Sequence, residues 1–157
     1  MKNIGLAFVL MIAACDNTSS PTEQMAEVRL LGINASGSAR VRVAGLNLTI
    51  DGRAWPDQVT DKELDLGQLD QAWAAATFNL PADAHKVAIN LQFQKAGTVV
   101  RNGKTQPLDL SGPPVNVMAD ATLMRPRSKV VLQLDLSRSL VDQGEQVFLL
   151  PDFIVLY

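Results

Sequence analysis

The chain has 157 residues and a formal net charge of −2, with 14 Lys and Arg residues against 16 Asp and Glu residues. This near balance excludes the strongly basic surface by which proteins bind nucleic acid. The single cysteine excludes an internal disulfide, and the single histidine leaves too few ligands for a tetrahedral zinc site.

The start of the chain has the organisation of a bacterial export signal. Lys2 supplies a positive charge, and an apolar run follows over residues 4–14. That run is shorter than the roughly 20 residues that a membrane-spanning helix needs, so it predicts a signal peptide over residues 1–14. The sequence Ile12-Ala13-Ala14-Cys15 resembles the lipobox of bacterial lipoproteins, which implies lipidation of Cys15. An ordinary secretory signal with a chance cysteine is the alternative.

Residues 15–26 are expected to connect the lipid to the folded part of the chain. Small polar residues, Pro, Glu and Gln dominate this segment, which predicts a flexible tether. Two or three acyl chains anchor a lipoprotein stably, so the resemblance implies an envelope protein that faces the periplasm. Asp16 resembles the signal that retains lipoproteins in the inner membrane of enteric bacteria, but both membranes stay open.

Residues 27–157 predict one β-rich domain. Apolar and polar side chains alternate along Val87–Phe93 and again along Val130–Leu136, as half-buried strands require. The pairs Asp51-Gly52 and Asn102-Gly103 are typical of tight hairpin turns, because these residue types tolerate positive φ. Short strands with such turns favour a mainly β fold, an antiparallel β-sandwich.

One segment has a different pattern. Over residues 61–76, Leu64, Leu66, Leu69 and Trp73 form roughly one apolar stripe among charged and alanine residues. This spacing predicts a short helix within residues 61–76, with Trp73 facing the core.

Three later segments carry a family resemblance. Leu80–Leu91, Leu132–Leu140 and Leu149–Val155 are similar to strands of a family of bacterial exported and lipoprotein domains of unknown function. Upstream, Leu46–Gly52 and Leu64–Leu66 fit the early strands of that family. The resemblance implies a transthyretin-like or immunoglobulin-like β-sandwich in the cell envelope, and it implies no reaction.

Groups able to carry catalysis or to bind a metal are few. His85 stands at an expected strand entrance without an activated nucleophile, which predicts a loop histidine. The EF-hand spacing and its glycine are missing around the densest carboxylates, which favours a solvated surface over a calcium site. Paired carboxylates of a glycosidase stay an alternative. These carboxylates are Asp57, Asp61, Glu63, Asp65 and Asp70. We predict no metal and no cofactor.

Three residues are candidates for ligand contact: Trp55, Asp135 and Arg138. Trp55 follows the Asp51-Gly52 turn, where it could form an exposed platform for a sugar or pack against a sheet edge. Asp135 points away from the face of its apolar neighbours, and Arg138 is close in sequence. An ion pair between Asp135 and Arg138 would order a turn, and contact with a ligand is the alternative.

Together these features predict a lipid-anchored protein of the bacterial cell envelope that acts as a non-catalytic binding or structural module. Its expected partners are the membrane, reached through the lipid on Cys15, and an envelope protein or a glycan. Two alternatives stay open. One is a carbohydrate-active or other hydrolytic accessory enzyme that uses loop carboxylates, and the other is a subunit of an envelope assembly. No nucleic-acid partner is expected.

Overall fold

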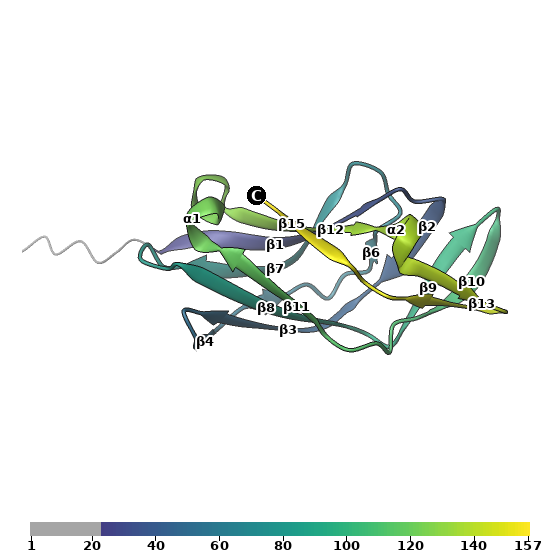
Figure 1. The fold of residues 1–157 in the computed structure, drawn as a ribbon, viewed down its shortest axis with the longest axis horizontal. Coiled ribbons are helices and arrows are strands. Elements are labelled where there is room, and N and C mark those ends of the chain that lie inside the picture. The colour runs from purple at the N-terminus through teal and green to yellow at the C-terminus, as the bar shows by residue number, and fades with distance from the viewer. Residues whose placement is uncertain (1–22) are drawn as a thin grey trace, which may run out of the picture.

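The computed structural model describes residues 23–157, which form mainly strands (Figure 1). Strands make up 62% of these residues, and this confirms the mainly β prediction. The expected signal peptide, Cys15 and the expected tether up to residue 22 lie outside the described residues. The last residues of the expected tether, 24–26, form the start of β1 (Gln24–Ile33) instead, and Ala26 is fully buried. No helix within residues 23–157 is long and apolar enough to cross a membrane.

The strands form three sheets. A five-stranded sheet, in the order β15-β12-β1-β7-β5, contains β1 (Gln24–Ile33), β5 (Gln58–Val59), β7 (Ala72–Leu80), β12 (Lys129–Asp135) and β15 (Phe153–Leu156). A four-stranded sheet, in the order β11-β8-β3-β4, contains β3 (Val43–Ile50), β4 (Arg53–Trp55), β8 (Lys86–Phe93) and β11 (Val115–Asp120). A six-stranded sheet, in the order β13-β14-β10-β9-β2-β6, contains β2 (Gly37–Val41), β6 (Leu64–Asp65), β9 (Ala96–Arg101), β10 (Lys104–Asp109), β13 (Leu140–Gln143) and β14 (Gln146–Leu149).

One hydrophobic core joins the three sheets. Every second residue of β8 is buried, from Val87 to Phe93, and the residues between them face outward. β12 follows the same rule, because Val130, Leu132 and Leu134 are each 0% exposed. Full burial of such a side chain contributes about 1.5–3 kcal/mol, and a slip by one residue would turn the whole set outward. The alternation therefore fixes the register of the strands.

The prediction that all strands pair antiparallel is wrong at two places. β1 runs parallel to β12, with Val28 opposite Val130, and β10 runs parallel to β14, with Leu108 opposite Val147. The other pairs, including all those of the four-stranded sheet, are antiparallel. Alternation of apolar residues reports which face of a strand is buried and carries no information on strand direction.

The predicted helix over residues 61–76 is also wrong. Residues Leu64–Asp65 form β6, a turn follows, and β7 begins at Ala72. Leu64 and Leu66 are both 1% exposed, whereas Leu69 is 68% exposed, so the apolar stripe does not exist. A spacing of two between buried leucines is a strand pattern, and a short window cannot separate it from a helical one.

The helical turns within residues 23–157 lie elsewhere and are short. They are α1 (Ala121–Met124), the 3₁₀ turn η1 (Arg125–Arg127) and α2 (Leu136–Ser139). Asp120 caps the start of α1 and Asp135 caps the start of α2, each accepting a backbone N–H two residues further on. Such carboxylate caps satisfy amide groups that a helix start leaves without partners.

Candidate functional site

A groove of about 450 Å³ opens beside Trp55, and we call it the Trp55 groove. It lies near the end of the molecule at which β1 begins, where β4 forms the edge of its sheet (Figure 1). Its lining residues are Glu23, Met25, Trp55, Pro56, Asp57, Gln58, Thr77, Phe78 and Asn79.

Three chain segments build this groove. Trp55 ends β4 opposite Leu48 of β3, and its ring packs partly against the core. The chain then passes Pro56 and enters β5, where Gln58 pairs with Thr77 of β7. The start of β1 supplies the third wall. The groove thus lies where an edge of the four-stranded sheet meets an edge of the five-stranded sheet.

Two residues that line the Trp55 groove each hold one buried polar atom without a hydrogen-bond partner among residues 23–157. These atoms are the indole Nε1 of Trp55 and the carboxylate Oδ2 of Asp57. Leaving such a group unsatisfied costs about 1–3 kcal/mol, so native proteins retain few of them. Of the three other such atoms, the Nε of Arg101 and of Arg125 belong to guanidinium groups whose terminal nitrogens are bonded, and the third is the hydroxyl oxygen of Ser139, alone in α2. The Trp55 groove therefore concentrates unsatisfied donor and acceptor capacity.

The pKa of Asp57 is raised above its ordinary value. Burial is the main cause because it disfavours the charged carboxylate, and the residue's own backbone N–H opposes the effect. The described residues that line the groove include Glu23 but no Lys or Arg. No positive charge in the lining therefore lowers the pKa of Asp57 again. The site offers an aromatic ring, an N–H donor and a carboxylate acceptor, with the exposed amides of Gln58 and Asn79 at its rim.

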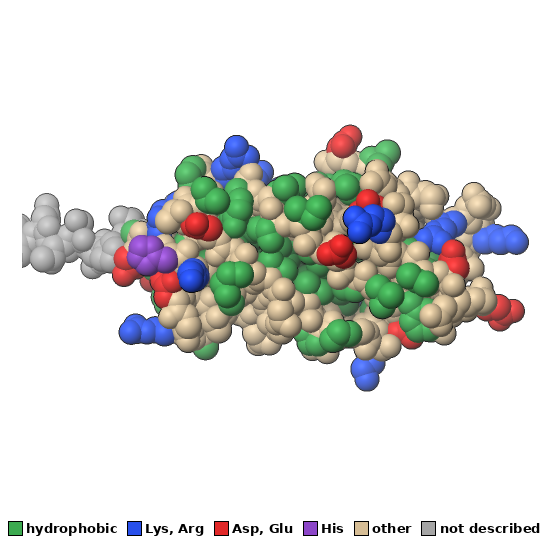
Figure 2. All heavy atoms as spheres, in the orientation of Figure 1, with side chains coloured by type: hydrophobic (Ala, Val, Ile, Leu, Met, Phe, Trp, Pro, Cys, Tyr) green, Lys and Arg blue, Asp and Glu red, His purple; other side chains and the backbone are tan. Residues whose placement is uncertain are grey.

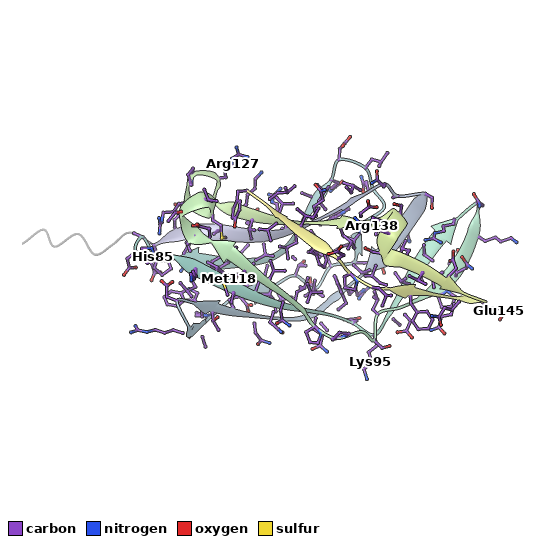
Figure 3. The ribbon with its side chains drawn as sticks, in the orientation of Figure 1. His85, Lys95, Met118, Arg127, Arg138 and Glu145 are labelled. Atoms are coloured by element: carbon purple, nitrogen blue, oxygen red, sulfur yellow. The ribbon has the colours of Figure 1, made fainter. Side chains whose placement is uncertain are left out.

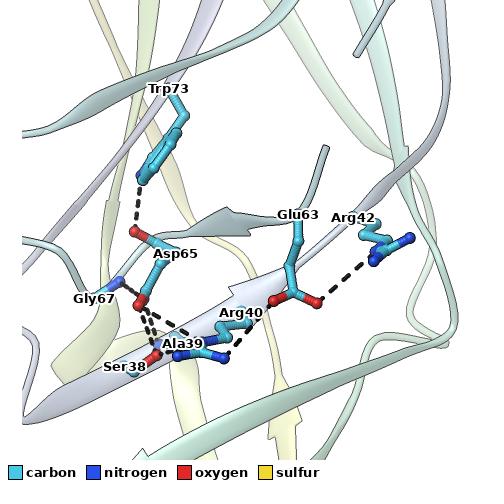
Figure 4. A network of polar contacts seen from close by, with 8 residues as sticks. All are labelled: Ser38, Ala39, Arg40, Arg42, Glu63, Asp65, Gly67 and Trp73. Carbon is cyan, nitrogen blue, oxygen red and sulfur yellow. Dashed lines mark hydrogen bonds and ion pairs between the residues drawn. The ribbon is translucent and has the colours of Figure 1, made fainter. Parts of the chain in front are cut away.

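A second polar cluster, centred on Asp65, has the opposite character (Figure 4). Asp65 Oδ1 accepts the backbone N–H of Ala39 at 2.9 Å and of Gly67 at 3.0 Å, and Oδ2 accepts the hydroxyl of Ser38 at 2.7 Å. The backbone carbonyl of Asp65 accepts the indole N–H of Trp73 at 2.8 Å. Both carboxylate oxygens and the backbone carbonyl of Asp65 thus have partners, so the cluster fixes the fold of β6.

The segment around Asp65 is also packed tightly between its neighbouring strands. A Cβ added to Gly67 would lie 1.9 Å from the carbonyl oxygen of Gly37, and one added to Gly32 would lie 1.9 Å from that of Leu66. Only glycine permits so close an approach of two backbones. These contacts give the Asp65 cluster a structural role and remove Asp65 from the set of catalytic candidates.

The other carboxylates that the sequence offers as candidates for catalysis do not form one site. Glu63 bridges Arg40 and Arg42 at 3.9 and 3.8 Å on the surface. Asp61 and Asp70 are exposed, and only Asp57 lines the groove. Within residues 23–157 no group of three or more His, Cys, Asp or Glu side chains is placed to hold a metal ion.

Asp135 and Arg138 lie together at α2 but do not pair as expected. Asp135 accepts the hydroxyl of Ser137 at 2.7 Å and the side-chain amide of Asn34 at 3.0 Å, and these bonds, with the backbone N–H of Ser137 at 3.0 Å, lower the pKa of its carboxyl group. Arg138 instead approaches Asp152 at 4.0 Å, with both side chains largely exposed. The predicted ion pair is wrong because the cap of α2 already occupies the carboxylate of Asp135.

His85 lies at the end of the molecule where the described chain begins, as its colour in Figure 2 shows, and Arg138 lies further toward the other end (Figure 3). The histidine is exposed, and its backbone N–H donates to the carboxylate of Asp51. Backbone donors at Lys86 and His85 lower the pKa of Asp51. Asp51 therefore holds the turn between β3 and β4 against the start of β8, which is a structural role.

Sequence reasoning found Trp55 but missed its neighbours in the groove. The sequence pattern predicts Asp57 to be one of several solvated carboxylates and gives no signal for Thr77 or Asn79. The last two reach the site only because β7 pairs with both β1 and β5. The signal for Asp57 in the sequence is its position. It follows Trp55 after one proline, shortly after the Asp51-Gly52 turn.

Comparison with known proteins adds no relative. No family model, no curated protein and no solved structure matches the chain. The function therefore has to be argued from the residues and the geometry described above.

Proposed function

We propose that this chain is a lipid-anchored binding module of the bacterial cell envelope, with the Trp55 groove as its ligand site. The pair of unsatisfied polar atoms in that groove, Trp55 Nε1 and Asp57 Oδ2, carries the proposal. Proteins keep such costly groups where a ligand or a reaction uses them. In this proposal the fold is the transthyretin-like β-sandwich that the sequence resemblance implies.

The anchor is the lipid expected on Cys15. The first described residues, Glu23 and Met25, line the Trp55 groove, so the groove opens close to the point where the tether would enter the domain. A ligand bound there would be held near the membrane surface. Asp16 supports retention in the inner membrane only weakly, and the outer membrane is the alternative.

The anchor is tested by changing Cys15→Ala in a bacterial host and separating membranes from soluble material. We expect the wild type in the membrane fraction, with a mass that shows acylation, and the variant in the soluble fraction. A variant that stays in the membrane fraction, or a wild type without acyl chains, would overturn the anchor.

The groove is tested with the lipidated, detergent-solubilised chain and the small-molecule fraction of a bacterial envelope digest. Binding is followed by tryptophan fluorescence. The Trp55→Phe variant retains only Trp73, so subtracting its signal from that of the wild type gives the fluorescence of Trp55. We expect components of the digest to quench Trp55, and Trp55→Ala to lose binding while its thermal midpoint changes little. Equal retention of components by wild type and Trp55→Ala would show that the groove is not the site.

A second candidate function is hydrolysis of a glycan. One observation favours it, since Asp57, whose pKa is raised as a general acid requires, shares the groove with the carboxylate of Glu23. Release of reducing sugar by the wild type, abolished in both Asp57→Asn and Glu23→Gln, would establish it. Binding without turnover in the wild type would leave the module non-catalytic.

A further inference from the structure

The Trp55 groove also restricts the chemical class of its ligand, an inference that rests on the proposed function. The described lining holds two carboxylates, Glu23 and Asp57, and no Lys or Arg. A phosphate or carboxylate ligand would face these like charges without a cation to offset them. The groove is therefore unsuited to anionic ligands.

The two unsatisfied atoms restrict the class further. Trp55 Nε1 can only donate a hydrogen bond, and the ionised carboxylate of Asp57 can only accept one. An ammonium group would satisfy Asp57 alone, and a ketone or ether would satisfy Trp55 alone. Hydroxyl groups both donate and accept, so adjacent hydroxyls of one ligand can satisfy both atoms.

Both atoms are shielded from water in the ligand-free structure. A ligand must therefore displace a covering side chain before it can bond them. Met25 lines the groove with 69% of its surface exposed and an unbranched side chain, so it can change rotamer at little cost when a ligand enters. Trp55 itself is half-buried and lines the groove, so part of its ring offers an apolar face to the C–H groups of a sugar.

From these constraints we infer that the Trp55 groove binds an uncharged saccharide. Its hydroxyls bond the indole N–H of Trp55 and the carboxylate of Asp57, and its remaining hydroxyls meet the exposed amides of Gln58 and Asn79 at the rim. A peptide also carries donors and acceptors. The saccharide is favoured because the site centres on an aromatic ring, and because the nearest strand edge, β5, has only two residues to pair with a peptide.

The inference is tested by titrating the lipidated chain with four probes: neutral chitotetraose and cellotetraose, anionic polygalacturonate, and tetraalanine. We expect a neutral saccharide to bind and the anionic polymer not to bind. Trp55→Ala should weaken saccharide binding by more than about tenfold, and Asp57→Asn by about fivefold or more. Asp61→Asn, an exposed aspartate on the same connection, is the matched control and should bind as the wild type does.

The outcomes separate the two proposals. If polygalacturonate or tetraalanine binds in a Trp55-dependent manner and both neutral saccharides fail, the saccharide inference is overturned and the proposed binding module stands. If a neutral saccharide binds equally to wild type, Trp55→Ala and Asp57→Asn, it binds elsewhere, which also overturns the inference. If neither the probes nor the envelope digest quench Trp55, both proposals fail.

Discussion

Two aspartates on the connection between β4 and β7 show how differently one residue type can be used. The carboxylate of Asp65 accepts three hydrogen bonds, from the backbone N–H groups of Ala39 and Gly67 and from the hydroxyl of Ser38. Asp57 leaves its Oδ2 buried without a partner among the described residues. The first arrangement stabilises the fold, whereas the second lowers stability and leaves an acceptor that a ligand could bond once the atom is uncovered.

The surroundings of the two carboxylates differ in the same sense. Around Asp65, glycines allow backbones to approach so closely that no side chain fits between them. Around Asp57 there is a hollow of about 450 Å³, with an aromatic ring on one side. Tight packing with satisfied polar groups marks a structural site, and open space with unsatisfied polar groups marks a candidate binding site. Variants at the two sites should therefore differ in the sign of their effect on stability.

The largest expected effect is that of Gly67→Ala. Its Cβ would lie 1.9 Å from the carbonyl oxygen of Gly37, which is backbone and cannot rotate away. We expect a loss of about 3 kcal/mol or more in the free energy of unfolding, measured by urea denaturation, or a loss of soluble protein. Gly45→Ala is the control, since nothing lies within 4 Å of its added Cβ. A stable Gly67→Ala variant would refute the close approach.

The next effect is that of Asp65→Asn. The amide keeps its oxygen toward the N–H groups of Ala39 and Gly67, but its NH₂ group then replaces the oxygen that accepts the hydroxyl of Ser38. The negative charge that strengthens all three bonds is lost as well. We expect a loss of about 2 kcal/mol in the free energy of unfolding. The control is Glu63→Gln, whose exposed ion pairs at 3.9 and 3.8 Å are worth about 0.5 kcal/mol or less. Equal effects of the two changes would refute the structural role of Asp65.

The contrast between these aspartates also shows which parts of the molecule the sequence could predict. Alternation placed β8 and β12 within one residue of their observed bounds, Lys86–Phe93 and Lys129–Asp135. Asn102-Gly103 forms the predicted turn, with φ of 50° and 72°, because both positions need positive φ. These features depend on residues next to one another in the chain, so local chemistry determines them.

Features that depend on distant pairing could not be predicted. The parallel pairing of β1 with β12 and the placement of Thr77 beside Gln58 result from how the sheets assemble. The difference between Asp57 and Asp65 has the same origin, since the partners of Asp65 come from β2 and from the turn at Gly67. In sequence the two residues are alike, each an aspartate in a polar connection.

Asp57→Asn should change stability in the opposite direction to Asp65→Asn. Removing the charge from a half-buried carboxylate with an unpartnered oxygen removes a desolvation cost. We expect the free energy of unfolding to rise by about 1 kcal/mol or less at neutral pH, because solvent still screens this group. Urea denaturation of the two Asn variants beside the wild type measures the difference. A loss of stability in Asp57→Asn would show that its carboxylate has a partner after all.

The smallest effect concerns pH. Burial raises the pKa of Asp57, so the folded chain holds this proton more tightly than the unfolded chain does. The stability contributed by this group is therefore greatest below its unfolded pKa and is lost as pH rises through the raised folded value. The advantage of Asp57→Asn over the wild type should accordingly shrink as pH falls from about 7 to about 3. The lowered pKa values of Asp51, Asp109, Asp120 and Asp135 act equally in both chains and cancel in the difference. An advantage that grows on acidification would mean that the Asp57 carboxylate is stabilised in the folded chain, and the contrast with Asp65 would then disappear.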